Sequence, residues 1–143
     1  RAAVLRLLVG MVGPADAEDC FQDTFLKALR AWPPPERGPL LDAWILTIAR
    51  NTARDLLRRR GREQPLDGEQ PAPADPRELV AAEPTELWEA VRALPPKQRA
   101  AVVLRIVLDQ SHAQIALVLE CSEAAARRSY ADGIAALRRE RQP

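Results

Sequence analysis

Apolar side chains recur along this chain every three or four positions, which is the spacing of helices that bury one face. In the first part of the chain this pattern predicts three helices, at about 1–12, 16–32 and 40–60. Asp16 is the candidate N-cap of the second helix, which ends at Pro33 because a residue before proline avoids the helical conformation. The faces expected to be buried are Phe21, Phe25, Ala28 and Leu29 in the second helix and Leu41, Trp44, Ile45, Ile48, Ala49, Thr52 and Leu56 in the third.

The last part of the chain shows the same periodicity and clearer helix starts. It predicts four helices, at about 85–94, 96–108, 111–119 and 122–139. Ser111 and Gln114 have the spacing of a capping box, and Ser122 is a candidate N-cap for the last helix.

Residues 64–84 separate these two parts and have a different composition. The stretch 64–86 holds five prolines, six acidic residues and one Arg, so it cannot sustain a helix and has little to bury. We therefore expect an all-α protein of two small helical domains, a three-helix module over 1–63 and a four-helix module over 85–143. A flexible, acidic, proline-rich linker joins them. Modules of about sixty residues are marginal alone, so each is expected to gain stability from the other or from a partner.

Net charge becomes informative only when it is divided along the chain. The total of 143 residues carries a formal charge of +1, but residues 1–63 carry +3, residues 64–86 carry −5 and residues 87–143 carry +3. Both helical modules are thus basic, and a polyanionic partner is compatible with the neutral total. Four arginines in five residues, Arg58 to Arg62, are more than a helix C-terminus needs and also indicate a polyanion.

Other function classes find little support. No apolar run reaches the ~18 residues of a membrane span, and Arg1 does not open a signal peptide, although the chain starts within a helical pattern and a preceding segment is expected. Cys20 and Cys121 lie far apart and are expected to be buried thiols in a reducing cytosol. The only histidine, His112, is interpreted as an exposed helix-start residue without a catalytic constellation. We expect no enzyme, no metal and no cofactor.

The last two predicted helices have the pattern of a DNA-binding helix-turn-helix. Ala116 supplies the small residue where the helices cross, and the core-facing positions are Ile115, Leu119, Ile134 and Leu137. The exposed start of the last helix offers side chains for phosphate and base contacts: Ser122, Glu123, Arg127, Arg128 and Tyr130. A plain helical hairpin with solvated charges is the alternative.

Three stretches, in this order, resemble extracytoplasmic-function (ECF) sigma factors, the compact promoter-recognition subunits of bacterial RNA polymerase. They are Asp16-Ala-Glu-Asp-Cys-Phe-Gln-Asp-Thr-Phe, then Ala43-Trp-Ile-Leu-Thr-Ile-Ala-Arg-Asn, then Leu94-Pro-Pro-Lys-Gln-Arg with the helix-turn-helix after it. The resemblance covers nearly the whole chain apart from 64–84.

The resemblance implies a role for each module. Residues 1–63 correspond to region 2, in which Asp19, Gln22, Asp23 and Phe25 would contact the β′ coiled coil of core RNA polymerase. The loop 33–39 and the following helix would open and read the −10 promoter element through Arg50, Asn51, Arg54, Arg58, Arg59 and Arg60. Residues 85–143 correspond to region 4, which reads the −35 element and binds the polymerase β flap. An anti-sigma factor covering both modules, a cytoplasmic location and no membrane insertion are also implied.

Some positions have alternative structural interpretations. Phe25 and Trp44 suit the core, and Arg50 suits an internal ion pair. In the part that resembles region 4, Arg99 and Arg105 are further candidates for contacts to the phosphate backbone.

The turn of the helix-turn-helix departs from the family pattern. Glu120 stands where the family has glycine. In a left-handed conformation a non-glycine residue would cost about 1 kcal/mol. Asp132 adds a second unusual negative charge. These departures support an alternative, a sigma-like adaptor with weakened DNA reading that acts by binding an anti-sigma factor. A DNA regulator that does not bind polymerase is the other alternative.

Overall fold

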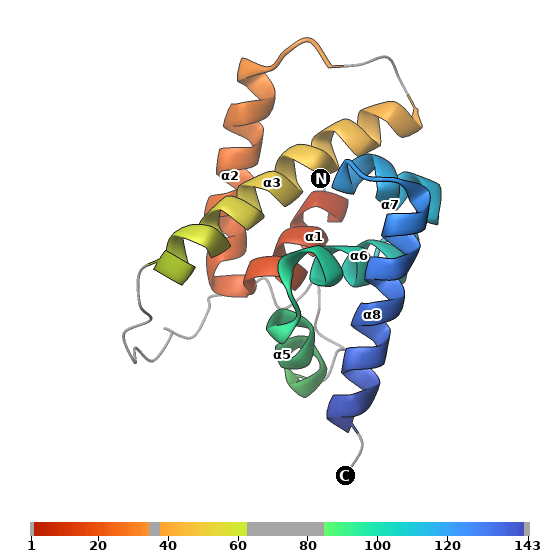
Figure 1. Ribbon diagram of the computed structural model, residues 1–143. Helices are drawn as coiled ribbons and strands as arrows, with labels where there is room; N and C mark the ends of the chain where they lie inside the picture. The colour runs from red at the N-terminus through yellow and green to blue at the C-terminus, as the bar shows by residue number, and fades with distance from the viewer. Residues whose placement is uncertain (1, 35–37, 63–84, 142–143) are drawn as a thin grey trace.

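The structure is a computed structural model that describes residues 2–34, 38–62 and 85–141. Within these residues the regular structure consists of seven helices, three before and four after the undescribed segment, which confirms the all-α prediction (Figure 1). They are α1 (Ala2–Val12), α2 (Pro14–Arg30), α3 (Pro39–Arg62), α5 (Thr85–Ala93), α6 (Pro96–Ile106), α7 (His112–Leu119) and α8 (Glu123–Arg141). The predicted linker 64–84 lies outside the described residues.

Local capping signals set several helix ends. Ser111 Oγ accepts from the Gln114 backbone N at 3.1 Å, and the Gln114 side chain accepts from the Ser111 backbone N at 2.8 Å, so the predicted capping box is confirmed. Ser122 Oγ accepts from the Ala125 backbone N at 3.1 Å and caps α8. The predicted N-cap of α2 is wrong, because Pro14 already starts that helix and places Asp16 in its first turn.

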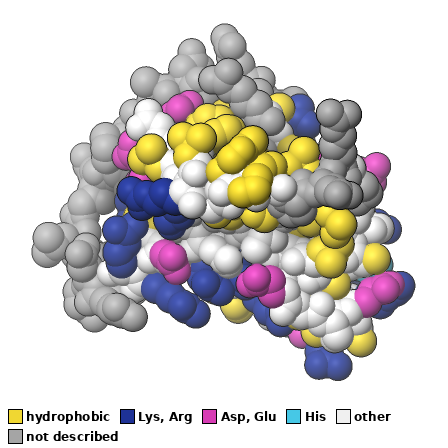
Figure 2. All heavy atoms as spheres, turned by 90° about the horizontal axis from the view of Figure 1, so that it is seen from above, with side chains coloured by type: hydrophobic (Ala, Val, Ile, Leu, Met, Phe, Trp, Pro, Cys, Tyr) yellow, Lys and Arg dark blue, Asp and Glu magenta, His cyan; other side chains and the backbone are white. Residues whose placement is uncertain are grey.

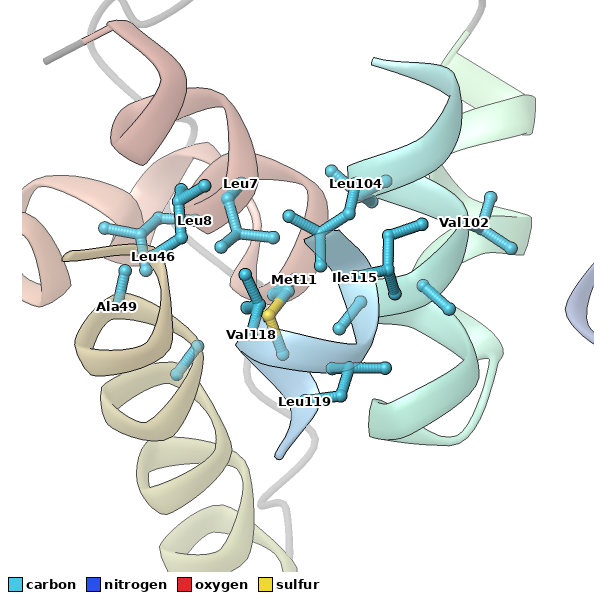
Figure 3. Close-up of a cluster of buried hydrophobic side chains, with 14 of the residues drawn as sticks. Leu7, Leu8, Met11, Leu46, Ala49, Val102, Leu104, Ile115, Val118 and Leu119 are labelled. Atoms are coloured by element: carbon cyan, nitrogen blue, oxygen red, sulfur yellow. The ribbon is translucent and has the colours of Figure 1, made fainter. Parts of the chain in front are cut away.

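The central helix α1 joins the two modules into one hydrophobic core. It packs against α2 and α3 on one side and against α5 and α6 on the other. Figure 3 shows Leu7 and Met11 of α1 between α3 and the pair α6–α7, with Leu104 and Ile115 close by. These four side chains are fully buried. The two modules thus bury apolar surface against each other, in agreement with the expectation that neither is self-sufficient.

The predicted buried face of α2 is only partly correct. Ala28 is buried and Phe21 is half-buried, but Phe25 and Leu29 are 41% and 66% exposed. The residues that α2 buries besides Ala28 are Ala17, Cys20 and Thr24. Small side chains let α2 approach its neighbours closely, and the Thr24 hydroxyl donates to the Cys20 carbonyl at 2.7 Å.

The buried face of α3 is rotated relative to the prediction. Ala49 and Thr52 are buried as expected, but Trp44 is half-buried and lies outside the main core, whereas Leu46 and Ala53 lie within it. The physical reason is that α3 packs against α1 and α2 and also against α7 and, less extensively, α6, so its buried band is set by four neighbours. In the helix-turn-helix, by contrast, the predicted core positions Ile115, Leu119 and Leu137 are buried and Ile134 is half-buried.

Candidate nucleic-acid and polymerase interfaces

The outer face of α2 collects the residues predicted to contact polymerase. Asp19, Gln22 and Asp23 are exposed, and the ring of Phe25 lies 4.8 Å from that of Phe21. The interpretation of Phe25 as a core residue is therefore wrong. Large apolar side chains continue this surface, and Figure 2 shows hydrophobic groups gathered on the end of the molecule where α2 ends and α3 begins. The exposed members in these two helices and the turn between them are Phe25, Leu26, Leu29, Trp32 and Leu40.

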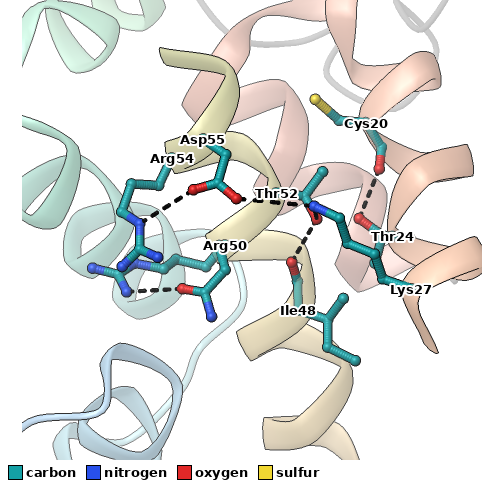
Figure 4. Close-up of polar contacts among 9 residues, drawn as sticks. Cys20, Thr24, Lys27, Ile48, Arg50, Thr52, Arg54 and Asp55 are labelled. Carbon is teal, nitrogen blue, oxygen red and sulfur yellow. Dashed lines mark hydrogen bonds and ion pairs between the residues drawn. The ribbon is translucent and has the colours of Figure 1, made fainter. Parts of the chain in front are cut away.

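One side of α3 is fastened to α2 by a polar cluster. Lys27 Nζ donates to Thr52 Oγ1 at 3.1 Å, and the Thr52 hydroxyl donates to the Ile48 carbonyl at 2.8 Å. Lys27 Nζ also lies 4.0 Å from an Asp55 carboxylate oxygen (Figure 4). These contacts fix which face of α3 is turned away from α2.

Arg50 and Arg54 extend from the other side of α3, away from Thr52 and Lys27 (Figure 4). Arg50 is only 7% exposed, and its Nη1 donates to Asn51 Oδ1 at 3.1 Å. Burial lowers the Arg50 pKa, nearby Arg54 lowers it further, and the Glu120 carboxylate opposes the shift. Among the described residues, Arg50 forms no ion pair within 4.0 Å, so the predicted internal ion pair is absent there.

The end of α3 is the exposed part of the basic surface. Arg58, Arg59 and Arg60 are all exposed. Arg60 holds both carboxylate oxygens of Asp16 at 2.5 and 2.6 Å, a bidentate pair that ties the end of α3 to the start of α2. Arg58 and Arg59 therefore make up the part of this cluster that is not engaged with Asp16.

The start of α8 presents most of the residues predicted to read DNA. Glu123, Arg127 and Arg128 are exposed, but an Arg127 Nη2 to Glu123 Oε1 contact of 2.6 Å joins two of them. Tyr130 is half-buried, and its ring meets the His112 ring edge-on at a centroid distance of 5.6 Å. Tyr130 is thus partly used in packing α7 on α8, and His112 is half-buried rather than exposed.

Two further arginines have structural partners. Arg99 is 8% exposed and donates to the Leu94 and Met11 carbonyls, so its predicted role at the phosphate backbone is wrong. Arg105 is half-buried and donates to the Gln110 carbonyl at 3.0 Å, which supports the turn between α6 and α7. No sequence signal marked Arg99 as internal, because a buried and a solvated arginine look alike in a helical pattern.

The turn between α7 and α8 has the backbone that the sequence suggested. Glu120 caps α7 with φ 55° and ψ 48°, a left-handed conformation that glycine adopts without strain. Cys121 follows it and is half-buried, while Cys20 is buried, and both thiols are free. The turn therefore carries a carboxylate in a conformation that costs energy for that residue.

The structure thus combines a helix-turn-helix, formed by α7 and α8, with the helix α3 that ends in exposed arginines. The family described as sigma-70 region 2 matches residues 1–63, and that described as sigma-70, region 4 matches residues 85–137. The chain belongs to the sigma-70 family, and its relatives include proteins named ECF RNA polymerase sigma factors, which confirms the resemblance. Sigma factors are transcription regulators.

Three curated relatives illustrate the similarity. RNA polymerase sigma factor CarQ of Myxococcus xanthus is 36% identical over 115 residues, covering 78% of this chain and 66% of CarQ. ECF RNA polymerase sigma factor EcfG of Rhodopseudomonas palustris is 32% identical over 118 residues, covering 80% and 65%. The probable RNA polymerase sigma factor RfaY of Xanthomonas campestris is 32% identical over 138 residues, covering 88% and 34%. The chain thus spans between 34% and 66% of the length of these relatives.

A solved structure shares the fold. The sigma factor RpoE, in a co-crystal structure with the anti-sigma factor NepR from Bartonella quintana, superposes with a TM-score of 0.72. The sequence identity is 23%, and the match covers 96% of this chain and 88% of RpoE. Among the described helices, none combines the length and apolarity that crossing a membrane requires.

Proposed function

We propose that the chain is an ECF-type initiation factor that binds core RNA polymerase and directs it to specific promoters in the cytoplasm, with no catalysis of its own. The observation that carries this proposal is the adjacency of two surfaces in the first module. The exposed acidic residues Asp19 and Asp23 lie in the first part of α2, and the Asp16–Arg60 pair joins the start of that helix to the basic end of α3. A protein that holds polymerase with one helix and melted DNA with the next needs this arrangement.

Each surface has a proposed partner. Asp19, Gln22, Asp23 and Phe25 would dock on the β′ coiled coil, and the arginines of α3 with Asn51 would bind the −10 strand. The start of α8 would read the −35 element, with the second module also holding the β flap. Phosphate contacts by arginine supply most of the affinity in such interfaces, while base contacts supply the specificity.

A sigma-like adaptor is the second candidate, and specific contacts favour it. Arg50 is buried, and Arg127 is paired with Glu123, so part of the basic surface is already engaged within the chain. Such a protein would act by binding an anti-sigma factor and would read DNA weakly.

Run-off transcription distinguishes the two candidates. The chain is mixed with core RNA polymerase and a template carrying the DNA upstream of its own gene. A specific transcript supports the initiation factor, whereas polymerase binding without a transcript supports the adaptor. Replacing Arg58 and Arg59 by alanine should weaken promoter opening and leave polymerase binding intact. Replacing Asp19 and Asp23 by alanine should weaken polymerase binding itself, and an equal loss of polymerase binding in both variants would contradict the assignment.

A further inference from the structure

One row of residues on α8 faces away from the rest of the second module. Its members stand three or four residues apart, which places them on one side of the helix, and all of them are exposed. They are Ala124, Arg128, Ala131 and Ala135. The opposite side of α8 packs against α6, where a Cβ on Gly133 would lie 2.7 Å from Val102 Cγ2. Since alanine side chains carry no polar atom, Arg128 is the member of this row that can donate hydrogen bonds.

The two neighbouring arginines of α8 differ in their partners. Arg127 Nη2 lies 2.6 Å from Glu123 Oε1, in an ion pair across one helical turn. Arg128 is also exposed, but it forms no ion pair within 4.0 Å with any residue that the structure describes. An exposed ion pair is weak, so Glu123 restrains Arg127 without locking it. The Glu123 carboxylate also offsets the charge of Arg127 and would be repelled by a phosphate.

The position of Arg128 suits a contact to a base edge. A helix-turn-helix inserts the start of its second helix into the major groove, and Arg128 lies in the second turn of α8. In that groove guanine presents two acceptors, N7 and O6, which match two donors of one guanidinium group. The flanking alanines are short, so they leave the arginine side chain room to reach the groove floor.

We propose that Arg128 is the residue of α8 that selects a base, and that the DNA it takes carries a guanine recognised through N7 and O6. Arg127, restrained by Glu123, adds affinity for any sequence but does not choose the base. This inference rests on the proposed function of α8 as the reader of the −35 element. It adds which residue makes the choice and which base is chosen.

Selection from random DNA tests the assignment. The full chain, alone and with core RNA polymerase, is mixed with double-stranded DNA that has a randomised central segment, and the bound duplexes are sequenced. The variants are Arg128→Ala and Arg128→Lys, and Arg127→Ala is the matched control on the next residue. Circular dichroism checks that each variant keeps its helix content.

The native chain should enrich duplexes with a guanine at one fixed position. Arg128→Ala should lose this preference, which we expect to be about tenfold over the other bases, while other positions of the motif stay unchanged. Arg128→Lys should lose most of it too, because lysine keeps the charge but lacks the planar fork of donors. Arg127→Ala should keep the guanine preference and bind every duplex more weakly.

A modified base separates a direct contact from an indirect effect. Replacing the selected guanine by 7-deazaguanine removes the N7 acceptor and keeps the base pair. The native chain should bind this duplex about fivefold or more weakly than the guanine duplex. Arg128→Ala should bind both duplexes equally, and an equal loss in this variant would show that another residue contacts N7.

The role of Glu123 has its own comparison. Glu123→Gln frees Arg127 for a phosphate, so the slope of log affinity against log salt should steepen by about one. Asp132→Asn is the matched control, because it also removes one exposed carboxylate of α8 but has no arginine paired with it among the described residues. An equal change of slope in both variants would refute the restraint of Arg127 by Glu123.

The outcomes separate this inference from the proposed function. It is overturned if Arg127→Ala, and not Arg128→Ala, loses the guanine, or if the folded native chain enriches no sequence with or without polymerase. A run-off transcript without any base preference at the −35 element would support the initiation factor and overturn the inference. An Arg128-dependent guanine preference of the chain without a transcript would support the inference and count against the initiation factor.

Discussion

Replacing Arg99 by methionine should destabilise the whole chain. The side chain lies in the core and satisfies the Leu94 and Met11 carbonyls, one in each module. Methionine fills a similar volume but donates nothing, so two buried carbonyls lose a donor. Each such loss costs about 1–3 kcal/mol. Part of this loss is offset, because the buried guanidinium is itself costly in the native protein. Burial, followed by the charge of nearby Arg92, lowers the Arg99 pKa, which shows that the charged form is disfavoured there. We expect the free energy of unfolding to fall by about 2–4 kcal/mol.

Urea unfolding followed by far-ultraviolet circular dichroism measures this loss. The midpoint should fall with little change in slope, because the surface exposed on unfolding stays the same. Arg105→Met is the matched control, since Arg105 is half-buried and makes one bond to the Gln110 carbonyl, so its loss should cost about 1 kcal/mol. Equal effects of the two substitutions would refute the argument that Arg99 joins the modules. So would loss of amide-exchange protection in α6 with none in α1.

Two more predictions concern the turn and the buried thiol. Glu120→Gly should have a free energy of unfolding about 1 kcal/mol higher than Glu120→Ala, because only alanine is strained at φ 55°. Its urea midpoint should therefore be higher, and equal midpoints would contradict the left-handed turn. Burial, followed by the charge of Asp16, raises the Cys20 pKa from 9.0 to about 11. The unfolded thiol therefore ionises first, and stability should fall as pH rises from about 9 to about 11, a loss that Cys20→Ala should abolish in thermal melts.

The sequence predicted the helices well because their ends depend on neighbours in the chain. Ser111, Ser122 and the proline run from Pro33 act within one or two turns of where they stand, and the structure places helix ends at each. The helix-turn-helix core was equally predictable, since its two helices are sequential and pack on each other, even though α7 packs on α3 as well and α8 on α6.

Buried faces were harder to predict where distant helices decide them. Leu29 fits an apolar stripe of α2, yet it is 66% exposed because α2 packs through smaller residues such as Ala17 and Cys20. Arg99 carried no signal of its internal role, which depends on the carbonyl of Met11 in another module. Gly10, by contrast, does have a signal in the sequence, because a glycine inside an apolar helical pattern often marks the close approach of another helix.

The position of α2 suggests the order in which the proposed partners would bind. If Arg50 contacts the −10 strand as proposed, α3 and α7 must separate for it to do so, because Arg50 is buried in the structure. Asp19, Gln22 and Asp23 are exposed while the two modules are packed together, so the proposed polymerase surface is accessible in this arrangement. Binding of polymerase at α2 therefore need not wait for α3 and α7 to separate. If polymerase also holds the second module apart from the first, it binds the open form better and shifts the population towards it. Promoter reading would then be restricted to chains already bound to polymerase, since free chains would keep Arg50 covered.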